Sequence, residues 1–588
     1  MWRSSRSLPV SRLILPRYNN KSQFYGLETM THKEYHQSKY SKRQKTVSKL
    51  AKEGSNEEVL LFDVKALLRE VFPLKRGNED IKGPETESSH RPEYSPPEKF
   101  SEVEVEISRL SSTGDGLGLS STSDHVYVVP FTVPGDIVQA KVVNHFAQAQ
   151  YTLTDFVKVV KPAPNRDDSL VRCPYFSKCA GCQLQMLPYE SQLKHKKSIV
   201  EKAFRNFSSL TLEVIPAVGD TIESPLQYGY RTKLTPHFDG PPGNMSRKAR
   251  RDPSERKQFT DVPPIGFMVK GTRKTIDIED CPIGTDSVRQ GIKIERKKIA
   301  AEIAKYMKGA TILLRETTTR KRNAALDQGN AEAETVSQRD ATPLIEHGSS
   351  LAIPEREASN LDRSNVNTSV ADTLPYIEEK TYISDSKAIS TEYIGDSEFK
   401  NTAGAFFQNN NSILPRFTAY IRDHIIPPSN IDDKTKPVKY LIDAYCGSGL
   451  FTITLSSIFS SSMGIDIAGA SIVSARENAI ANKVSNASFM TADASKLFQE
   501  VTYPPEKTAV IIDPPRKGCD DAFLQQLLKF GPQRVVYVSC NVHTQARDVG
   551  VLVEGQGNCR YKIESLQGFD LFPQTGHVEG VAVLSRSA

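Results

Sequence analysis

From residue 439 onward the chain alternates short apolar, β-branched runs with helical stretches, and this pattern constrains the fold more than any other feature. The pattern predicts strands at 439–444, 462–465, 487–490, 508–513, 534–539, 560–566 and 578–585. The helices predicted between them include 467–482 and 520–530. Such alternation with short connections predicts a doubly wound, Rossmann-like parallel sheet. Ligands of these sheets bind at the carboxyl ends of the strands, so the residues that follow each strand form the candidate site.

Two strand ends carry features of a nucleotide-like ligand site. The first strand runs into Tyr445 and the glycine loop 446–449, where the backbone can approach a ligand closely. Asp466 ends the second strand, about 20 residues further on, where an acid binds ribose hydroxyls in dinucleotide folds. Its alternative role is to cap the next helix. No P-loop lysine follows Gly449, which favours an adenosine-bearing ligand without a triphosphate over nucleotide hydrolysis.

Two further strand ends carry reactive groups. Asp513 ends the fourth strand and precedes the rigid turn Pro514-Pro515, and Cys540 follows the fifth strand. We predict that Cys540 is a nucleophile, the alternative being a buried apolar residue, which is the usual role of a free cysteine. Glu579 lies where the chain enters the last strand and is a candidate general base, or else a solvated loop carboxylate.

The N-terminal part of the chain divides into three predicted regions. Residues 1–27 are rich in arginine and serine and contain no acid, as in a mitochondrial transit peptide or an unstructured basic RNA-binding arm. Residues 28–98 are basic and polar, with one short helix before Pro73. Residues 99–162 contain short alternating strands, which predict a small β-barrel that either binds RNA or serves only for packing.

A group of cysteines marks the predicted central domain, 163–315. Cys173, Cys179 and Cys182 have the spacing C-x5-C-x2-C, and Cys281 lies far along the chain. Four thiolates can hold either zinc or a [4Fe–4S] cluster, and the spacing does not choose between them. Residues 316–375 are polar and aperiodic, which predicts a disordered insertion before a last domain at 382–588.

The formal net charge of +6 suits an RNA partner without proving one. No apolar run approaches the ~18 residues of a membrane span, so we expect no membrane partner. Nothing in the sequence indicates an obligate protein partner.

Several segments together resemble the S-adenosylmethionine-dependent RNA (uracil-5-)-methyltransferases. Those segments are 404–409, 443–451, 511–516, 536–541 and 571–579. The stretch VPFTVPGDIVQAKV resembles a TRAM domain, an RNA-binding barrel, and CPYFSKCAGCQLQ resembles the cysteine cluster of several members. The transit-like start and long insertions resemble the fungal tRNA branch, whose enzymes methylate uridine 54 in the T loop of the T arm. We therefore expect a mitochondrial location, a cytoplasmic or nuclear one, or both.

The resemblance implies a role for each matching residue. Gln408, Tyr445, Asp466 and Asp513 would contact S-adenosylmethionine, Cys540 would be the nucleophile and Glu579 the base. Asp466 departs from the longer glutamate of many members, although a shorter acid can still accept from ribose hydroxyls. The cysteines Cys173, Cys179, Cys182 and Cys281 would hold [4Fe–4S], with zinc as the alternative.

The implied chemistry explains why a thiol is needed. Carbon 5 of uracil is a poor nucleophile, and a thiolate that adds to carbon 6 activates it. We therefore expect Cys540 to have a lowered pKa or a nearby proton acceptor. The alternatives are methylation of ribosomal RNA, methylation of another atom, and a non-catalytic RNA-binding protein on the same fold.

Overall fold

The computed structural model describes residues 52–71, 96–119, 125–244, 252, 256–322, 376–426, 437–493, 498 and 501–587. The predicted transit segment 1–27 and most of the predicted insertion, 323–375, lie outside these ranges. Within them, no helix has both the length and the apolar character needed to cross a membrane.

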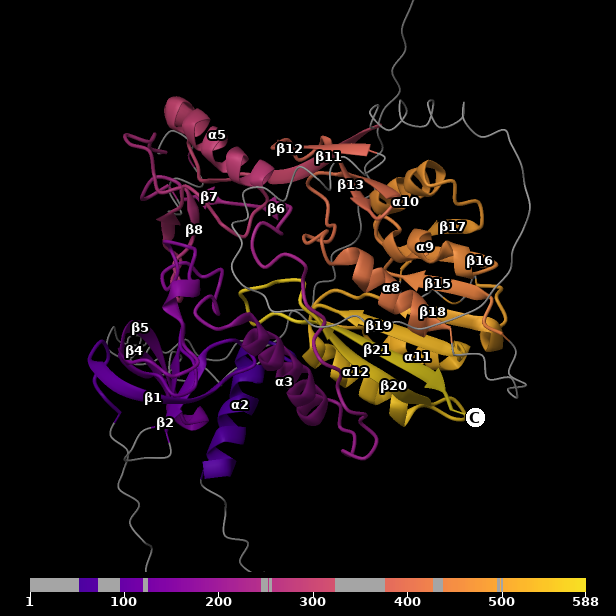
Figure 1. Cartoon of the computed structure of the whole chain (residues 1–588), viewed down its shortest axis with the longest axis horizontal. Helices are drawn as coiled ribbons and strands as arrows, with labels where there is room; N and C mark the ends of the chain where they lie inside the picture. The colour runs from indigo at the N-terminus through magenta and orange to yellow at the C-terminus, as the bar shows by residue number, and fades with distance from the viewer. Residues whose placement is uncertain are drawn as a thin grey trace, which may run out of the picture. The chain divides into compact units, whose positions relative to one another are not determined.

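A seven-stranded sheet forms the C-terminal domain, in the order β17-β16-β15-β18-β19-β21-β20 (Figure 1). Its strands are β15 (Tyr440–Ala444), β16 (Ser461–Asp466), β17 (Ala487–Thr491), β18 (Thr508–Ile512), β19 (Arg534–Ser539), β20 (Tyr561–Phe569) and β21 (Glu579–Arg586). The first five in this order are parallel, and β21 is antiparallel to both neighbours. The predicted doubly wound α/β fold is confirmed. The chain winds outward in both directions from β15 and β18, and a ligand crevice is expected at that switch point.

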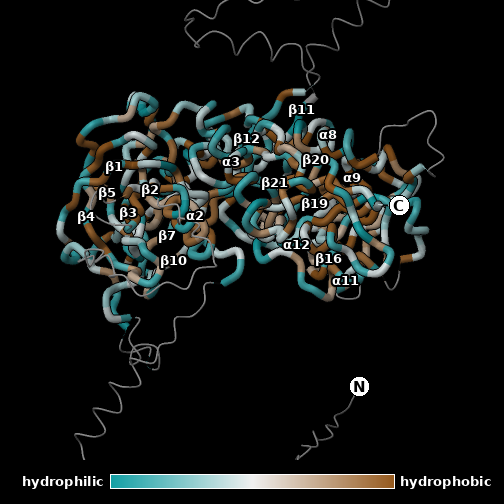
Figure 2. The backbone as a smooth tube through the Cα atoms, turned by 90° about the horizontal axis from the view of Figure 1, so that it is seen from below, coloured by the Kyte–Doolittle hydropathy of each residue, from teal (hydrophilic) through white to brown (hydrophobic). Residues whose placement is uncertain are grey.

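Helices cover both faces of this sheet, so its central strands are buried on both sides. One face packs against α3 (Tyr189–Phe207), α11 (Asp521–Phe530) and α12 (Val542–Glu554). The other packs against α8 (Leu414–Ile425), α9 (Leu450–Thr454) and α10 (Gly469–Ala481). Neighbouring residues of a strand serve opposite faces, as Leu441 and Ile442 do. Figure 2 shows this apolar interior as brown tube around β19 and β16.

The N-terminal region contains the predicted barrel. Its strands are β1 (Glu102–Leu110), β2 (Gly116–Leu119), β3 (Val126–Val129), β4 (Ile137–Phe146) and β5 (Tyr151–Lys161). They close in the order β1-β2-β3-β5-β4. In β1 the valine and isoleucine at 105 and 107 are buried while the glutamates between and before them are exposed, as the alternation predicts. The predicted short helix is α2 (Asn56–Val71), whose apolar face packs on the barrel.

In the central region the structure differs from the predicted start of the insertion at 316 and of the last domain at 382, because regular strands extend past both points. This region contains α5 (Asp286–Glu302) and the short strands β6 (Lys233–Leu234), β7 (His237–Phe238), β8 (Gly266–Met268), β9 (Thr275–Asp277) and β10 (Ala310–Thr311). Strand β11 (Leu314–Arg322) continues past 316, and β12 (Tyr376–Ile383) pairs with it from beyond the insertion. The physical reason is a run of strand-favouring threonines followed by cross-strand ion pairs, such as Arg320 to Glu378 at 2.9 Å. A hairpin of β13 (Ile389–Ile394) and β14 (Ser397–Thr402) then leads to the sheet.

Candidate active site

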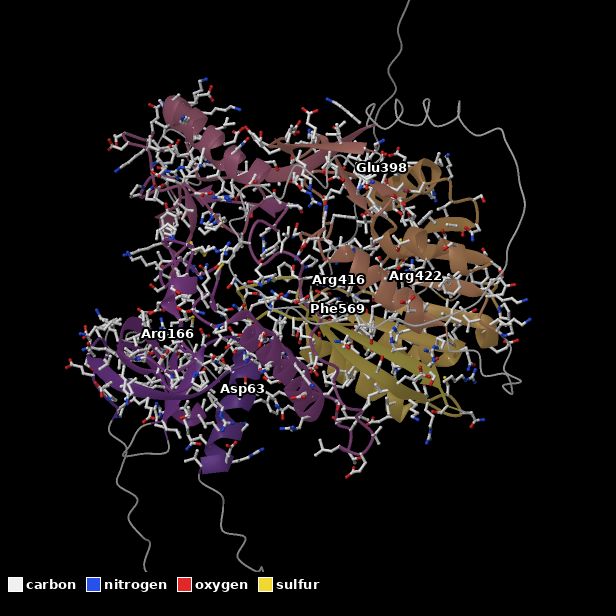
Figure 3. The ribbon with its side chains drawn as sticks, viewed as in Figure 1. Asp63, Arg166, Glu398, Arg416, Arg422 and Phe569 are labelled. Carbon is white, nitrogen blue, oxygen red and sulfur yellow. The ribbon has the colours of Figure 1, made fainter. Side chains whose placement is uncertain are left out.

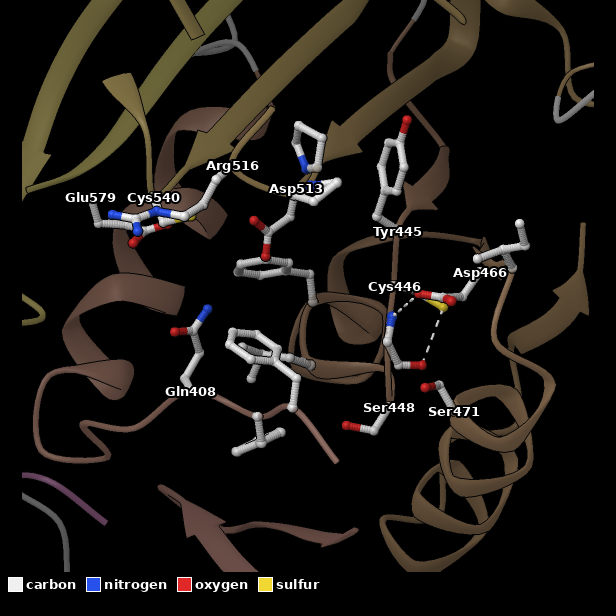
Figure 4. Close-up of a pocket in the computed structure, with 18 of the residues that line it drawn as sticks. Gln408, Tyr445, Cys446, Ser448, Asp466, Ser471, Asp513, Arg516, Cys540 and Glu579 are labelled. Carbon is white, nitrogen blue, oxygen red and sulfur yellow. Dashed lines mark hydrogen bonds between the residues drawn. The ribbon is translucent and has the colours of Figure 1, made fainter. Parts of the chain in front are cut away.

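A cavity of about 810 Å³ opens at the carboxyl ends of β15, β16, β18 and β19. All six residues that the sequence nominates for cofactor binding and catalysis line it: Gln408, Tyr445, Asp466, Asp513, Cys540 and Glu579. Figure 4 shows Tyr445 and Asp466 on one side, Cys540 and Glu579 on the other with Gln408 below them in this view, and Asp513 between. We call the end with Tyr445 and Asp466 the binding end and the end with Cys540 and Glu579 the reactive end, after the roles that the sequence predicts for them.

At the binding end, a strained turn brings the glycine loop to Asp466. Tyr445 has a left-handed backbone (φ 65°), which a non-glycine residue holds at a cost of about 1–3 kcal/mol and which is typical of functional sites. The amide of Gly447 donates to Asp466 Oδ2 at 3.0 Å, and the amide of Ala468 donates to Oδ1 at 2.7 Å. The N-cap residue of α10 is Ala468, and no side chain caps that helix, so Asp466 does not have the alternative capping role. Each Asp466 oxygen that accepts a main-chain amide keeps a further lone pair for a ligand hydroxyl.

At the reactive end, the antiparallel register of two strands places the candidate base beside the candidate nucleophile. Ser539 of β19 pairs with Gly580 of β21, so Cys540 and Glu579 extend the same pairing by one step. Glu579 is almost fully buried at 2% exposure, and its carboxyl and that of Asp513 both act on the thiol. This adjacency joins residues 39 positions apart in the sequence.

The electrostatics of this end differ from the expectation of a lowered thiol pKa. Burial, reinforced by the carboxyls of Glu579 and Asp513 and opposed by Arg516, raises the pKa of Cys540 to about 12. The expected lowered pKa is wrong for this cavity because desolvation disfavours the thiolate. Burial and the charge of Asp513 also raise the pKa of Glu579 well above its ordinary value. Burial, reinforced by the charge of Asp443, raises the pKa of Asp513 to about 7. A carboxyl with a raised pKa is a stronger base when ionised, so either Glu579 or Asp513 can be the expected proton acceptor.

Two cavity residues, Arg516 and His577, are not among those that the sequence nominates. The Arg516 guanidinium donates to Nδ1 of His577 at 3.1 Å. Burial, reinforced by Arg516, lowers the pKa of His577 to about 4, so the imidazole is neutral and accepts this hydrogen bond. The position of Arg516 directly after the 513–515 turn was the available signal. His577 carried none beyond its place in the 571–579 segment.

Buried contacts to α3 hold the segment that leads into Glu579. Lys196 donates to Oδ1 of Asp570 at 2.5 Å and to the carbonyl of Phe572 at 3.0 Å, and Tyr189 donates to Oδ2 of Asp570 at 2.9 Å. The side chains of both Lys196 and Asp570 are fully buried. The central region therefore positions the segment that leads to the candidate base, Glu579.

The four nominated cysteines line a second cavity, of about 180 Å³. Burial raises the pKa of every one of these thiols. The charge of Cys281 further raises the pKa of Cys182, and the charges of Cys173 and Cys179 further raise the pKa of Cys281, so the thiols lie close enough to interact. Among the described residues, however, no three histidine, cysteine or acidic side chains are spaced to hold a metal ion. The four thiols thus fit a four-thiolate centre in composition and location, although their sulfur atoms are not at the distances that a shared metal ion requires.

The fold and the cavity define an α/β methyltransferase domain in a chain that also carries a small β-barrel. The model of the tRNA (Uracil-5-)-methyltransferase family matches residues 377–587, and the TRAM domain model matches 96–151. The chain is 41% identical to the tRNA (uracil(54)-C(5))-methyltransferase of Schizosaccharomyces pombe, over 93% of this chain and 86% of that protein. It is 39% identical to the protein of the same name in Saccharomyces cerevisiae, over 82% and 73% of the two chains.

The chain therefore belongs to the tRNA (uracil-5-)-methyltransferase family. Its fold is also similar to the crystal structure of Pyrococcus abyssi tRNA (uracil-54, C5)-methyltransferase in complex with S-adenosyl-L-homocysteine. That similarity has a TM-score of 0.51 at 21% identity and covers 82% of this chain and all of the other.

Proposed function

We propose that this protein transfers a methyl group from S-adenosylmethionine to carbon 5 of uridine 54 in the T loop of tRNA, through a covalent bond between Cys540 and carbon 6. The observation that carries the proposal is the β19–β21 register, which sets Glu579 beside Cys540 at the end of a cavity whose other end holds Asp466. The names of the two fungal relatives support the substrate and the position.

The cavity residues fit the cofactor. Asp466, fixed by two main-chain amides, would accept from ribose hydroxyls, and the ring of Tyr445 would pack against the adenosine. Gln408, which lines the same cavity, would orient the remainder of the cofactor. The bound cofactor supplies an activated methyl group on a sulfonium.

The reaction requires the chain to move two protons. The Cys540 thiol gives its proton to the carboxylate of Asp513, so Glu579 stays ionised, and the sulfur bonds to carbon 6 as the 5,6 double bond shifts toward oxygen 4. After carbon 5 has taken the methyl group, Glu579 removes the carbon 5 proton. The bond between sulfur and carbon 6 then breaks and the double bond returns. Arg516 assists the first step because its charge favours the thiolate. The target base must leave its stack to reach this cavity.

The test uses an unmodified tRNA transcript and purified protein. Methylation should appear as 5-methyluridine at position 54, and a transcript with cytidine at that position should remain unmethylated. Cys540→Ala should bind cofactor but form no product. Product from this variant at the wild-type rate would overturn the covalent step. Methylation of a ribosomal RNA fragment in place of tRNA would move the substrate and keep the chemistry.

We also propose that Cys173, Cys179, Cys182 and Cys281 hold a [4Fe–4S] cluster, with zinc as the alternative. Their convergence on one cavity and their four-thiolate composition support this. Iron, sulfide and zinc analysis of anaerobically purified protein tests it. Cys281→Ser should lower the metal content, and Cys559→Ser, a buried cysteine elsewhere, should not.

We propose import into mitochondria, with a cytoplasmic or nuclear location beside it or in its place, on the basis of the acid-free, arginine-rich residues 1–27. Fusion of these residues to a fluorescent protein tests it, and diffuse fluorescence would contradict it.

A further inference from the structure

The segment that precedes α2 contacts the loop that carries Cys540. Asn541 donates one amide hydrogen to the carbonyl of Gly54 at 3.1 Å and the other to the carbonyl of Arg516 at 2.9 Å. Glu53 forms an ion pair with Arg547 of α12 at 3.1 Å. One side-chain amide thus joins the N-terminal segment to two loops of the reactive end.

The close approach depends on the absence of a side chain at Gly54. Gly54 has φ +67°, and a Cβ there would lie 2.3 Å from Cγ2 of Thr544, in the first turn of α12. Thr544 itself donates to the carbonyl of Arg516 at 3.2 Å. The Glu58 side chain accepts from the Gly54 amide at 2.6 Å, and the Ser55 hydroxyl accepts from the Glu58 amide at 3.3 Å. This capping arrangement begins α2 directly after the contact between Gly54 and the Cys540 loop.

Beyond this cap, α2 is anchored in the barrel and against α3 (Figures 1 and 3). Its apolar face shares a core with the barrel strands, and Asp63 accepts from the amide of Ser112 at 2.5 Å. The ring of Phe62 lies 4.7 Å from that of Phe207 on α3, which lies 5.1 Å from His543 on α12. Two separate sets of contacts therefore connect α2 with the first turn of α12. One runs through Gly54 and Asn541, and the other through Phe207 and His543.

We propose that residues 52–55 are a positioning element for the Cys540 loop. They hold Asn541 and the first turn of α12 against barrel-anchored α2, and so set where the thiol stands relative to the target uracil. The inference rests on the proposed function of Cys540. The segment lies outside both ranges that the family models match, 96–151 and 377–587.

The test compares substitutions at two glycines in the full-length protein. Gly54→Ala introduces the overlap with Thr544. Gly557→Ala is the matched control, because Gly557 has φ +59° and an added Cβ there meets no atom within 4 Å. A third variant combines Gly54→Ala with Thr544→Ser, which removes the overlapping methyl group and keeps the hydroxyl. The measurements are the single-turnover methylation rate, the affinity for S-adenosylmethionine, and the pH profile of Cys540 alkylation by iodoacetamide.

Gly54→Ala should slow methylation by about tenfold or more at unchanged cofactor affinity, because small misplacement of a reacting group costs that much. It should also shift the alkylation profile of Cys540. Gly557→Ala should do neither, and Thr544→Ser should restore both properties. The proposal is overturned if the two glycine variants behave alike, or if Thr544→Ser rescues nothing. A shifted alkylation profile with normal methylation would overturn it too. Full activity of Cys540→Ala would instead signal failure of the proposed covalent step.

Discussion

Removing the Lys196 charge should destabilise the protein, because its partner would remain as a buried charge. Lys196→Met deletes the ammonium that lies 2.5 Å from Asp570 Oδ1, with both side chains fully buried. Burial alone lowers the pKa of Lys196, and the Asp570 charge opposes that effect, so the pair is held by mutual neutralisation. Tyr189 would be left as the donor to the carboxylate.

The expected loss is about 3–5 kcal/mol of unfolding free energy, the usual cost of breaking a buried ion pair from one side. Adding Asp570→Asn should recover about half of that loss, since the uncompensated charge is gone and Tyr189 can still donate to the amide oxygen. Lys197→Met is the control, because that neighbouring lysine pairs with the exposed Asp220 and should matter little.

Urea denaturation followed by circular dichroism measures all three variants. The pair anchors the segment before Glu579. Lys196→Met should therefore also slow single-turnover methylation, measured at urea concentrations below the unfolding midpoint of this variant, where it is still folded. A loss for Lys196→Met no larger than that for Lys197→Met would refute the reasoning.

Two further variants test cavity residues, and a third tests Asp443, a fully buried residue of β15. Asp466→Ala removes the acceptor of the Gly447 amide and should weaken S-adenosylmethionine binding about tenfold to a hundredfold. Calorimetry measures this affinity, and an unchanged value would argue against the binding of ribose hydroxyls by Asp466. Burial raises the pKa of Asp443 from 3.8 to about 7, so its contribution to stability is present below about pH 4 and is lost as pH rises through about 7. Asp443→Asn can keep the hydrogen bonds from Thr452 and does not titrate, so its stability relative to wild type should rise between pH 4 and 8; a constant difference would contradict this. Glu579→Gln should bind RNA and cofactor normally but accumulate the methylated adduct, visible as a denaturant-resistant RNA–protein band, and rapid turnover would exclude it as the base.

Local sequence patterns predict the sheet and the residues that lie at the carboxyl ends of its strands. The β-branched runs before Tyr445, Asp513 and Cys540 are buried strands, and residues that follow parallel strands must meet at one edge. The same argument placed Asp466 correctly at the end of β16. These predictions needed only periodicity and the topology of alternating strands and helices.

Features that depend on pairing between distant segments were not predictable in this way. The adjacency of Glu579 and Cys540 follows from the register of β21 against β19, which no local pattern encodes. Strand β11 was read as part of an insertion because its partner lies beyond residue 375. The raised pKa of Cys540 arises mainly from desolvation by the assembled cavity, and the position of a residue at a strand end does not predict how deeply it is buried.

The most direct test of the central claim uses T-arm RNA that carries 5-fluorouridine at position 54, with the protein and S-adenosylmethionine. Glu579 cannot remove fluorine as a proton, so the reaction should stop with RNA bonded to the enzyme. The account predicts a denaturant-resistant complex whose peptide mass places the RNA on Cys540. It is contradicted if cofactor and RNA both bind but no adduct forms, or if the adduct maps to another residue.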